Sequence, residues 1–182
     1  MNAQNIHQKK RTAVKTFRLP EDVLDFLEKE AEDEGTTLNA LVSSILIRHS
    51  EWGSMARKLG MISVSKSLLQ AALESSRDEE LVATSRKILP QGWKDMAMFK
   101  FHDFSLESMI QLFKLLTKYG YEADMDVNRV GNKYMISFRH ALGPKFSLLL
   151  KNAIDELLRV SFHIQPTIET SDASVAVTFS AP

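Results

Sequence analysis

The sequence predicts an α+β protein with a strand-helix-helix unit at the N-terminus, a helical connector, and a C-terminal antiparallel sheet with helices on one face. Three observations predict this arrangement. The first fifty residues change from an alternating apolar pattern to two runs with apolar residues every three or four positions. The helical spacing continues to about residue 92. From residue 93 onward, segments with helical spacing of apolar residues are interspersed with segments in which apolar and polar residues alternate, which is typical of helices packed on an antiparallel sheet.

The composition is that of an ordinary folded protein. Hydrophobic residues make up 44% of the 182 residues and charged residues 25%, which argues against a disordered, collagen-like or disulfide-scaffold protein. The sequence contains no cysteine, so it has no thiolate nucleophile and no cysteine-ligated metal. It has no apolar run of membrane-spanning length, and its polar start lacks the apolar core of a signal peptide. We therefore expect a cytoplasmic protein with no membrane partner.

Charge is divided unevenly along the chain, although the net charge is zero. Residues 1–20 carry five basic residues and no acidic one, and most of these lie in or beside a basic arm at residues 1–11. Residues 21–34 carry eight acidic residues and a single basic one. Such asymmetry can mark a nucleic-acid contact, although blocks of charge are more often solvated surface, so charge alone does not decide between the two.

Residues 12–19 predict a short strand that ends at Pro20, because polar and apolar residues alternate there. One face of this strand carries Phe17 and Leu19. The opposite face carries Val14, Thr16 and Arg18.

Two helices are expected after the strand. The first has an acidic start and an apolar stripe that ends at Gly35. The second is capped by Thr36 or Thr37 and is expected to end at Gly53. The resulting domain, residues 12–53, is too small to bury a core by itself. With neither cysteine nor a metal motif, it is expected to dimerise.

The segments KTFRLPEDVLD at residues 15–25 and GTTLNAL at residues 35–41 resemble the ribbon-helix-helix family of DNA-binding repressors. The resemblance covers residues 12–52. It implies an obligate homodimer whose paired strands enter the major groove of double-stranded DNA. It places the base-reading positions on the outward strand residues Val14, Thr16 and Arg18. It places a phosphate clamp on the start of the second helix, at Thr37, Leu38 and Asn39.

The chemistry of these residues suits those roles. Arg18 can donate two hydrogen bonds to a guanine edge, and Thr16 can donate or accept one. Val14 departs from the polar residue usual at its position, although an apolar side chain can contact a thymine methyl group. The free N–H groups at the start of a helix attract phosphate. Further phosphate contacts are expected from the basic residues Lys9, Lys10, Arg11 and Lys15. A charged edge strand that avoids aggregation is the alternative.

Residues 54–92 predict a connector of two or three helices, with Ser65 as a cap. The sequence Pro90-Gln91-Gly92 is predicted as the boundary of the next domain, residues 93–182. The elements expected in that domain are a strand at 96–102, a helix at 105–120, strands at 121–128 and 134–138 joined by a Gly131-Asn132 turn, a helix at 145–159, and strands at 160–164 and 175–179. This order favours a ferredoxin-like sheet.

The connection between the strand at 134–138 and the following helix combines residue types that bind anions. It carries Arg139, His140, Lys145 and Ser147 around a Gly-Pro turn, and we take these four as a candidate anion or effector site. An ordinary strand-to-helix loop is the alternative. The stretch His-x-Leu-Gly-x-Lys-aromatic-Ser at residues 140–147 is similar to one in uncharacterised archaeal predicted regulators.

No metal, cofactor or catalytic centre is expected. His102, His140 and His163 are too far apart in sequence for ligand spacing on one helix or strand. The sequence contains no Ser–His–acid order, phosphate loop or paired-carboxylate motif, so we do not expect an enzyme.

Three functions remain in competition. The leading one is a dimeric, sequence-specific transcriptional regulator that associates with the nucleoid and whose C-terminal domain senses an unidentified effector or builds a tetramer or larger assembly. An antitoxin that neutralises a toxin and represses its own operon is the second, but such proteins usually carry a short disordered tail. An architectural chromosome-binding protein is the third, and it would be expected to carry a net positive charge.

Overall fold

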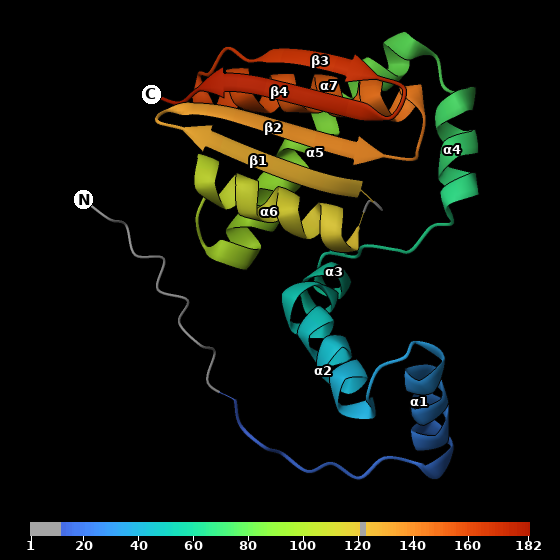
Figure 1. Ribbon diagram of the computed structural model, residues 1–182. Coiled ribbons are helices and arrows are strands. Elements are labelled where there is room, and N and C mark those ends of the chain that lie inside the picture. Colours follow the sequence, from blue (N-terminus) through green and yellow to red (C-terminus); the bar gives the residue numbers. More distant parts are fainter. Residues whose placement is uncertain (1–11, 121–122) are drawn as a thin grey trace. The chain divides into compact units, whose positions relative to one another are not determined.

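The computed structural model of the protein describes residues 12–120 and 123–182. The chain divides into two units, Met1–Leu46 and Ile47–Pro182. The first unit includes helix α1 (Glu21–Asp33) and most of helix α2 (Leu38–Arg48). The second unit combines helices with a four-stranded antiparallel sheet (Figure 1), which confirms the predicted α+β class.

Helix α1 forms as the sequence predicted, but the strand predicted before it, at residues 12–19, does not form in the single chain. The helix starts directly after Pro20 and ends before Gly35, whose φ of 64° is the left-handed stop that the sequence predicted. Residues 12–20 form neither helix nor strand in the single chain. The physical reason is that a strand is held by hydrogen bonds to a neighbouring strand, and residues 12–46 of the first unit contain no other strand.

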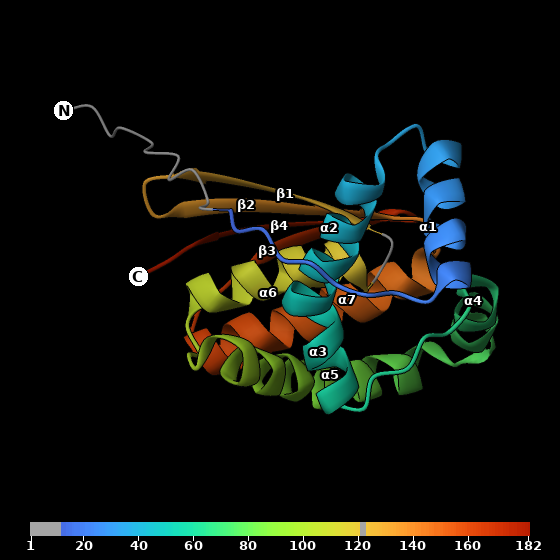
Figure 2. The same cartoon turned by 90° about the horizontal axis from the view of Figure 1, so that it is seen from below.

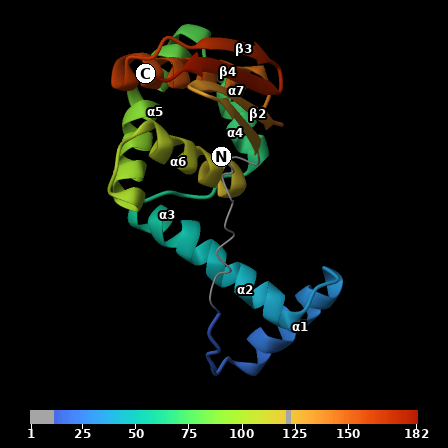
Figure 3. The same cartoon turned by 60° about the vertical axis from the view of Figure 1, so that its left-hand side comes forward.

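The second helix continues beyond Gly53, where the sequence predicted its end. Helix α2 passes into a π-helical turn, η1 (His49–Gly53), and then into α3 (Ser54–Lys58), as one helical run (Figure 3). Gly53 has a helical φ of −58°, and a side chain at its position would crowd the ring of His49. This glycine therefore fits a crowded turn inside the helix, whereas Gly60, with a φ of 69°, follows its end.

The next two helices show one correct prediction and one wrong boundary. Ser65 caps α4 (Lys66–Ser75) as predicted, since its Oγ accepts a hydrogen bond from the Leu68 N–H at 3.4 Å. The boundary at Pro90-Gln91-Gly92 and the strand at 96–102 are wrong, because α5 (Asp78–Phe101) runs through both. One face of α5 is buried. We attribute the unbroken helix to this burial, which offsets the cost of an internal proline, about 3 kcal/mol.

The remaining elements are α6 (Leu106–Tyr119), β1 (Ala123–Val130), β2 (Lys133–His140), α7 (Pro144–Glu156), the π-helical turn η2 (Leu157–Ser161), β3 (Thr167–Ser171) and β4 (Ser174–Ser180). Ser105 and Ser108 form a capping box at the start of α6, which confirms the predicted cap. The strand predicted at 160–164 is wrong. The helical path continues through η2, and His163, with a φ of 56°, then turns the chain toward β3.

The sheet has the order β1-β2-β4-β3, with every neighbouring pair antiparallel. These are the strand positions and directions of a ferredoxin-like sheet, but the chain fills them in a permuted order. In the ferredoxin-like order the strand before the first helix lies beside the third strand. In this protein α6 takes the place of that first helix, but it follows α5 and not a strand. The position beside β2, where the strand before the first helix would lie, is filled by β4, the last element of the chain. The prediction of this sheet was therefore right in geometry and wrong in connectivity.

Helices cover one face of the sheet, as predicted. Figure 2 shows the sheet, then α6 and α7, and then α5 as successive layers. Alternate side chains of the two central strands face the helices and are buried: Tyr134, Ile136 and Phe138 in β2, and Val175, Val177 and Phe179 in β4. The opposite face carries polar side chains, including Arg139, which forms an ion pair with Asp126 at 2.7 Å.

Candidate functional site

The residues predicted to read bases lie in a part of the chain without regular structure. Val14, Thr16 and Arg18 are all exposed, and so is Lys15. Lys9, Lys10 and Arg11 lie outside the described residues. In the single chain no strand pairing holds Thr16 and Arg18 in a common orientation, so a base-reading surface requires a neighbour for residues 12–20.

The residues predicted to form a phosphate clamp lie at the start of α2. Thr37 is the cap, because its Oγ accepts a hydrogen bond from the Ala40 N–H at 3.2 Å. Its carbonyl accepts the Leu41 N–H at 2.9 Å. The N–H groups of Leu38 and Asn39 precede the first intrahelical bond and have no backbone partner in the described part of the chain. These two donors, together with the helix dipole, can bind an anion.

Helix α1 leaves two apolar side chains exposed, one of which the sequence predicted to be covered. The predicted apolar stripe comprised Val23, Leu24, Leu27 and Ala31, and of these Leu24, Leu27 and Ala31 are at least partly covered. Val23 is exposed, contrary to the prediction, and forms a second apolar stripe with Phe26, three residues further on, which keeps 66% of its surface exposed. The spacing was visible in the sequence, but only the structure shows that the single chain leaves this stripe uncovered.

The four residues of the predicted anion site do not converge, so that prediction is wrong. Arg139 and His140 are neighbours in β2 and therefore face opposite sides of the sheet. The ion pair of Arg139 with Asp126 raises the pKa of its guanidinium. Lys145 donates a hydrogen bond to the carbonyl of Ser76 at 3.0 Å and forms an ion pair with Asp78. Arg139 and Lys145 are thus both already paired with carboxylates.

His140 and Ser147 form a buried contact that ties the end of β2 to the first turn of α7. His140 Nε2 lies 2.9 Å from Ser147 Oγ, and both residues are buried. The Leu142 N–H donates to His140 Nδ1 at 3.3 Å. Nδ1 is therefore an acceptor, and Nε2 carries the ring hydrogen and donates a hydrogen bond to Ser147 Oγ. Burial lowers the pKa of His140, so the ring is held neutral.

This contact predicts that the second unit loses stability in mild acid. The pKa of His140 in the folded state lies below its ordinary value of about 6.5, so the unfolded state binds the proton first. The free energy of unfolding should fall as the pH drops below about 6.5 and level off below the folded-state pKa. Urea unfolding at a series of pH values, for the natural chain and His140→Gln, measures this contribution. An equal pH dependence in the two proteins would contradict it.

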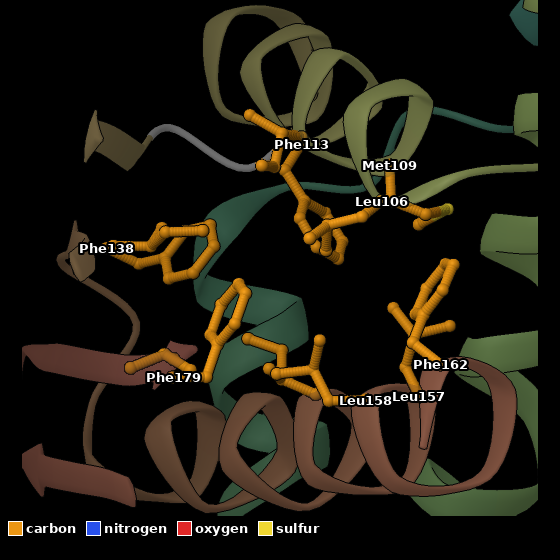
Figure 4. Close-up of a pocket in the computed structure, with 12 residues that line it drawn as sticks. Leu106, Met109, Phe113, Phe138, Leu157, Leu158, Phe162 and Phe179 are labelled. Atoms are coloured by element: carbon orange, nitrogen blue, oxygen red, sulfur yellow. The ribbon is translucent and has the colours of Figure 1, made fainter. Parts of the chain in front are cut away.

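The core of the second unit contains a cavity that is too small for a ligand. It lies between α6, α7 and the sheet, and Figure 4 shows aromatic and aliphatic side chains around it, including Phe113, Phe138 and Phe179. Its volume is about 20 Å³ and its lining is apolar. A space of this size has room for about one water molecule, and an apolar lining offers such a water no hydrogen bonds. We interpret it as a packing void.

Among residues 12–120 and 123–182, no three His, Cys, Asp or Glu side chains gather as a metal site. Within the same residues, no helix has the length and apolar character needed to cross a membrane. No protein-family model matches the sequence, and a comparison with curated proteins finds no match.

Proposed function

We propose that the protein is a dimeric, sequence-specific DNA-binding transcriptional regulator. Residues 12–20 of two copies would pair as an antiparallel ribbon that enters the major groove. The observation that carries this proposal is the exposed apolar surface of the first unit. Its large exposed apolar side chains are Val14, Phe17, Leu19, Val23, Phe26, Ile45 and Leu46.

A second copy accounts for this surface. Among residues 12–46 the only buried side chains are those of Ala31 and Leu41, so a single copy has almost no core. Helices of this length are marginal in water without tertiary packing. Pairing two copies would supply each segment 12–20 with a neighbouring strand and cover Phe17 and Leu19 at the same time.

The polar residues of the unit favour DNA as the ligand. In an antiparallel ribbon Thr16 and Arg18 would share the face opposite Phe17 and Leu19, and such a ribbon fits the major groove. The free N–H groups of Leu38 and Asn39 would receive a backbone phosphate. The buried core and paired sheet of the second unit fit a sensing or oligomerisation domain better than the disordered tail of an antitoxin.

The direct experiment is selection of fragments of the source genome that bind the full-length protein. We expect recovery of a palindromic site, because a two-fold symmetric dimer reads two equivalent half-sites. Recovery of random fragments with equal affinity would favour an architectural protein. Failure to retain any DNA at low salt would contradict DNA binding itself.

Arg18 and Lys10 should differ in their effects on binding. Arg18→Ala should weaken binding to the selected site by about 1–3 kcal/mol and relax the base preference there, because a bidentate base contact is lost. Lys10→Ala should weaken binding to all sequences and flatten the salt dependence, since it would remove a phosphate contact. Titrations of specific and random DNA at several salt concentrations measure both effects. Equal losses on the two DNAs for Arg18→Ala would assign Arg18 to phosphate.

A further inference from the structure

The second unit contains a cavity of about 350 Å³, which lies at the lower end of the range of small-molecule sites. It is distinct from the core void, and it meets the loop between His140 and Ser147 only at Leu142. Its walls come from the helical run 48–56, the stretch 61–66, Leu69, the end of α6 and Leu142. Two larger hollows of the same unit are lined by Arg139 and by Lys145, which already form ion pairs.

Two aromatic side chains on the cavity wall are held in place by other contacts. Trp52 is only 8% exposed and stacks on Tyr119, with ring centroids 6.3 Å apart. The Tyr119 hydroxyl donates to Glu51 Oε2 at 2.7 Å, and Lys118 Nζ donates to the same oxygen at 3.0 Å. This hydrogen bonding and stacking give the cavity a fixed, flat apolar wall before any ligand binds.

Gly120 keeps this wall open. A Cβ at this position would lie 3.0 Å from the Leu116 carbonyl oxygen and 3.4 Å from the ring of Trp52. The approach to the carbonyl oxygen is tight, so a larger residue would shift the end of α6 slightly, and its side chain would begin in contact with the indole. Gly120 also lines the cavity itself, so its missing side chain leaves space there.

The charged lining of the cavity is basic. Arg48 and Lys66 belong to the lining, whereas none of the described lining residues is acidic. Arg48 has no hydrogen-bond or ion-pair partner in the part of the chain that the structure describes. Arg48 lies one helical turn before Trp52 and both residues line the cavity, so a cationic and an aromatic side chain border the same space. This combination fits a ligand with a flat apolar body and one negative group.

We propose that this cavity binds a small amphipathic carboxylate, with the carboxylate at Arg48 and the apolar body against Trp52 and Tyr119. Arg48, Trp52 and Ala56 line it at four-residue intervals along the helical run that begins as α2. The ligand would therefore contact the same helix whose first turn holds the predicted phosphate clamp. Regulation of DNA binding by the ligand, transmitted along this helix, rests on the proposed function, whereas binding of the carboxylate does not.

Isothermal titration calorimetry of the full-length protein, without DNA, tests the binding. Phenylacetate and octanoate serve as the carboxylate probes, and phenylacetamide serves as the neutral match for phenylacetate. We expect both carboxylates to bind, and phenylacetamide to bind at least about tenfold more weakly than phenylacetate, because it lacks the charge-assisted hydrogen bond. Absence of binding by both carboxylates up to about 10 mM would overturn the proposal.

Two arginine variants locate the carboxylate. Arg48→Met should lower the affinity for phenylacetate about tenfold and leave the affinity for phenylacetamide unchanged. Arg57→Met removes an exposed arginine that does not line the cavity, and it should bind like the natural chain. Unchanged phenylacetate binding by Arg48→Met, or equal losses in the two variants, would overturn the assignment.

A third variant tests the cavity as the location of the apolar body. Ala56→Phe places a ring in the cavity and should weaken phenylacetate and phenylacetamide alike, with circular dichroism and the melting temperature confirming that the variant is folded. Undiminished binding by the folded variant would contradict the location.

DNA titrations with and without phenylacetate then address regulation separately. Loss of DNA binding in every condition would count against the proposed function and leave the calorimetric result standing.

Discussion

Phe26→Asp should convert the proposed dimer into a monomer. Phe26 is 66% exposed in the single chain, and in a dimer it would be covered together with Val23 by the second copy. Its replacement would remove a large buried ring and place an unpaired carboxylate in an apolar interface, in both copies at once. We expect the dissociation constant of the dimer to rise at least about 100-fold, as measured by sedimentation equilibrium of the full-length chain. Binding to the selected DNA site should be lost in parallel.

Val160→Asp is the matched control for this experiment. Val160 is an apolar residue of the second unit with a similar exposure, 62%, and it lies outside the proposed dimer surface. Its substitution should leave the dimer intact. If Phe26→Asp sediments like the natural chain, or if Val160→Asp dissociates the dimer equally, then the surface around Phe26 is not the interface.

Trp93→Ala should cost the second unit about 3–5 kcal/mol of stability. Trp93 is 1% exposed and lies on α5, where its ring meets the edge of Phe113 at a centroid distance of 4.9 Å. Truncation to alanine would leave a cavity in the layer between α5 and α6 that neighbouring side chains fill only in part. Urea unfolding followed by circular dichroism measures the loss.

Phe99→Ala provides the comparison on the same helix. Phe99 is also aromatic, but it keeps 41% of its surface exposed, and Lys58 Nζ lies 5.8 Å from the centre of its ring. Its truncation should cost far less than that of Trp93, because little buried volume is lost. Similar losses for the two variants would contradict the core that we describe around α5.

Local signals predicted many of the element boundaries correctly, because they act within a few residues. Gly35 follows α1, Thr37 caps α2 and Ser105 caps α6, each through backbone geometry or a hydrogen bond to a nearby N–H. The Gly131-Asn132 turn joins β1 and β2 as predicted. Alternation also identified the buried face of β2 correctly.

Elements that depend on distant contacts were predicted less well. Pro90 and Gly92 are strong local breakers, yet α5 passes through them with one face buried against the rest of the unit. Residues 160–164 have strand-like alternation, but the helical path of α7 extends through Ser161. No sequence pattern states which strands become neighbours, so the permuted order of the sheet could not be predicted.

The candidate sites show the same division. The cap at Thr37 and its two free N–H groups were predicted, since they depend only on the start of a helix. The anion site failed because alternation in β2 separates Arg139 from His140 and because Asp78, far away in sequence, pairs with Lys145. The cavity beside Trp52 was not predicted, since its walls come from segments more than ninety residues apart in the sequence.

The permuted strand order has a consequence for how the protein folds during synthesis. β1 and β2 form a local hairpin, and so do β3 and β4, but β2 meets β4 only across α7 and β3. The inner edge of β2 therefore emerges from the ribosome unpaired and stays so until a whole helix and two further strands have been made. Non-local strand pairings form slowly, and an unpaired apolar edge invites association with other chains. The nascent chain is thus most vulnerable to aggregation, and most dependent on chaperones, between the synthesis of β2 and that of β4.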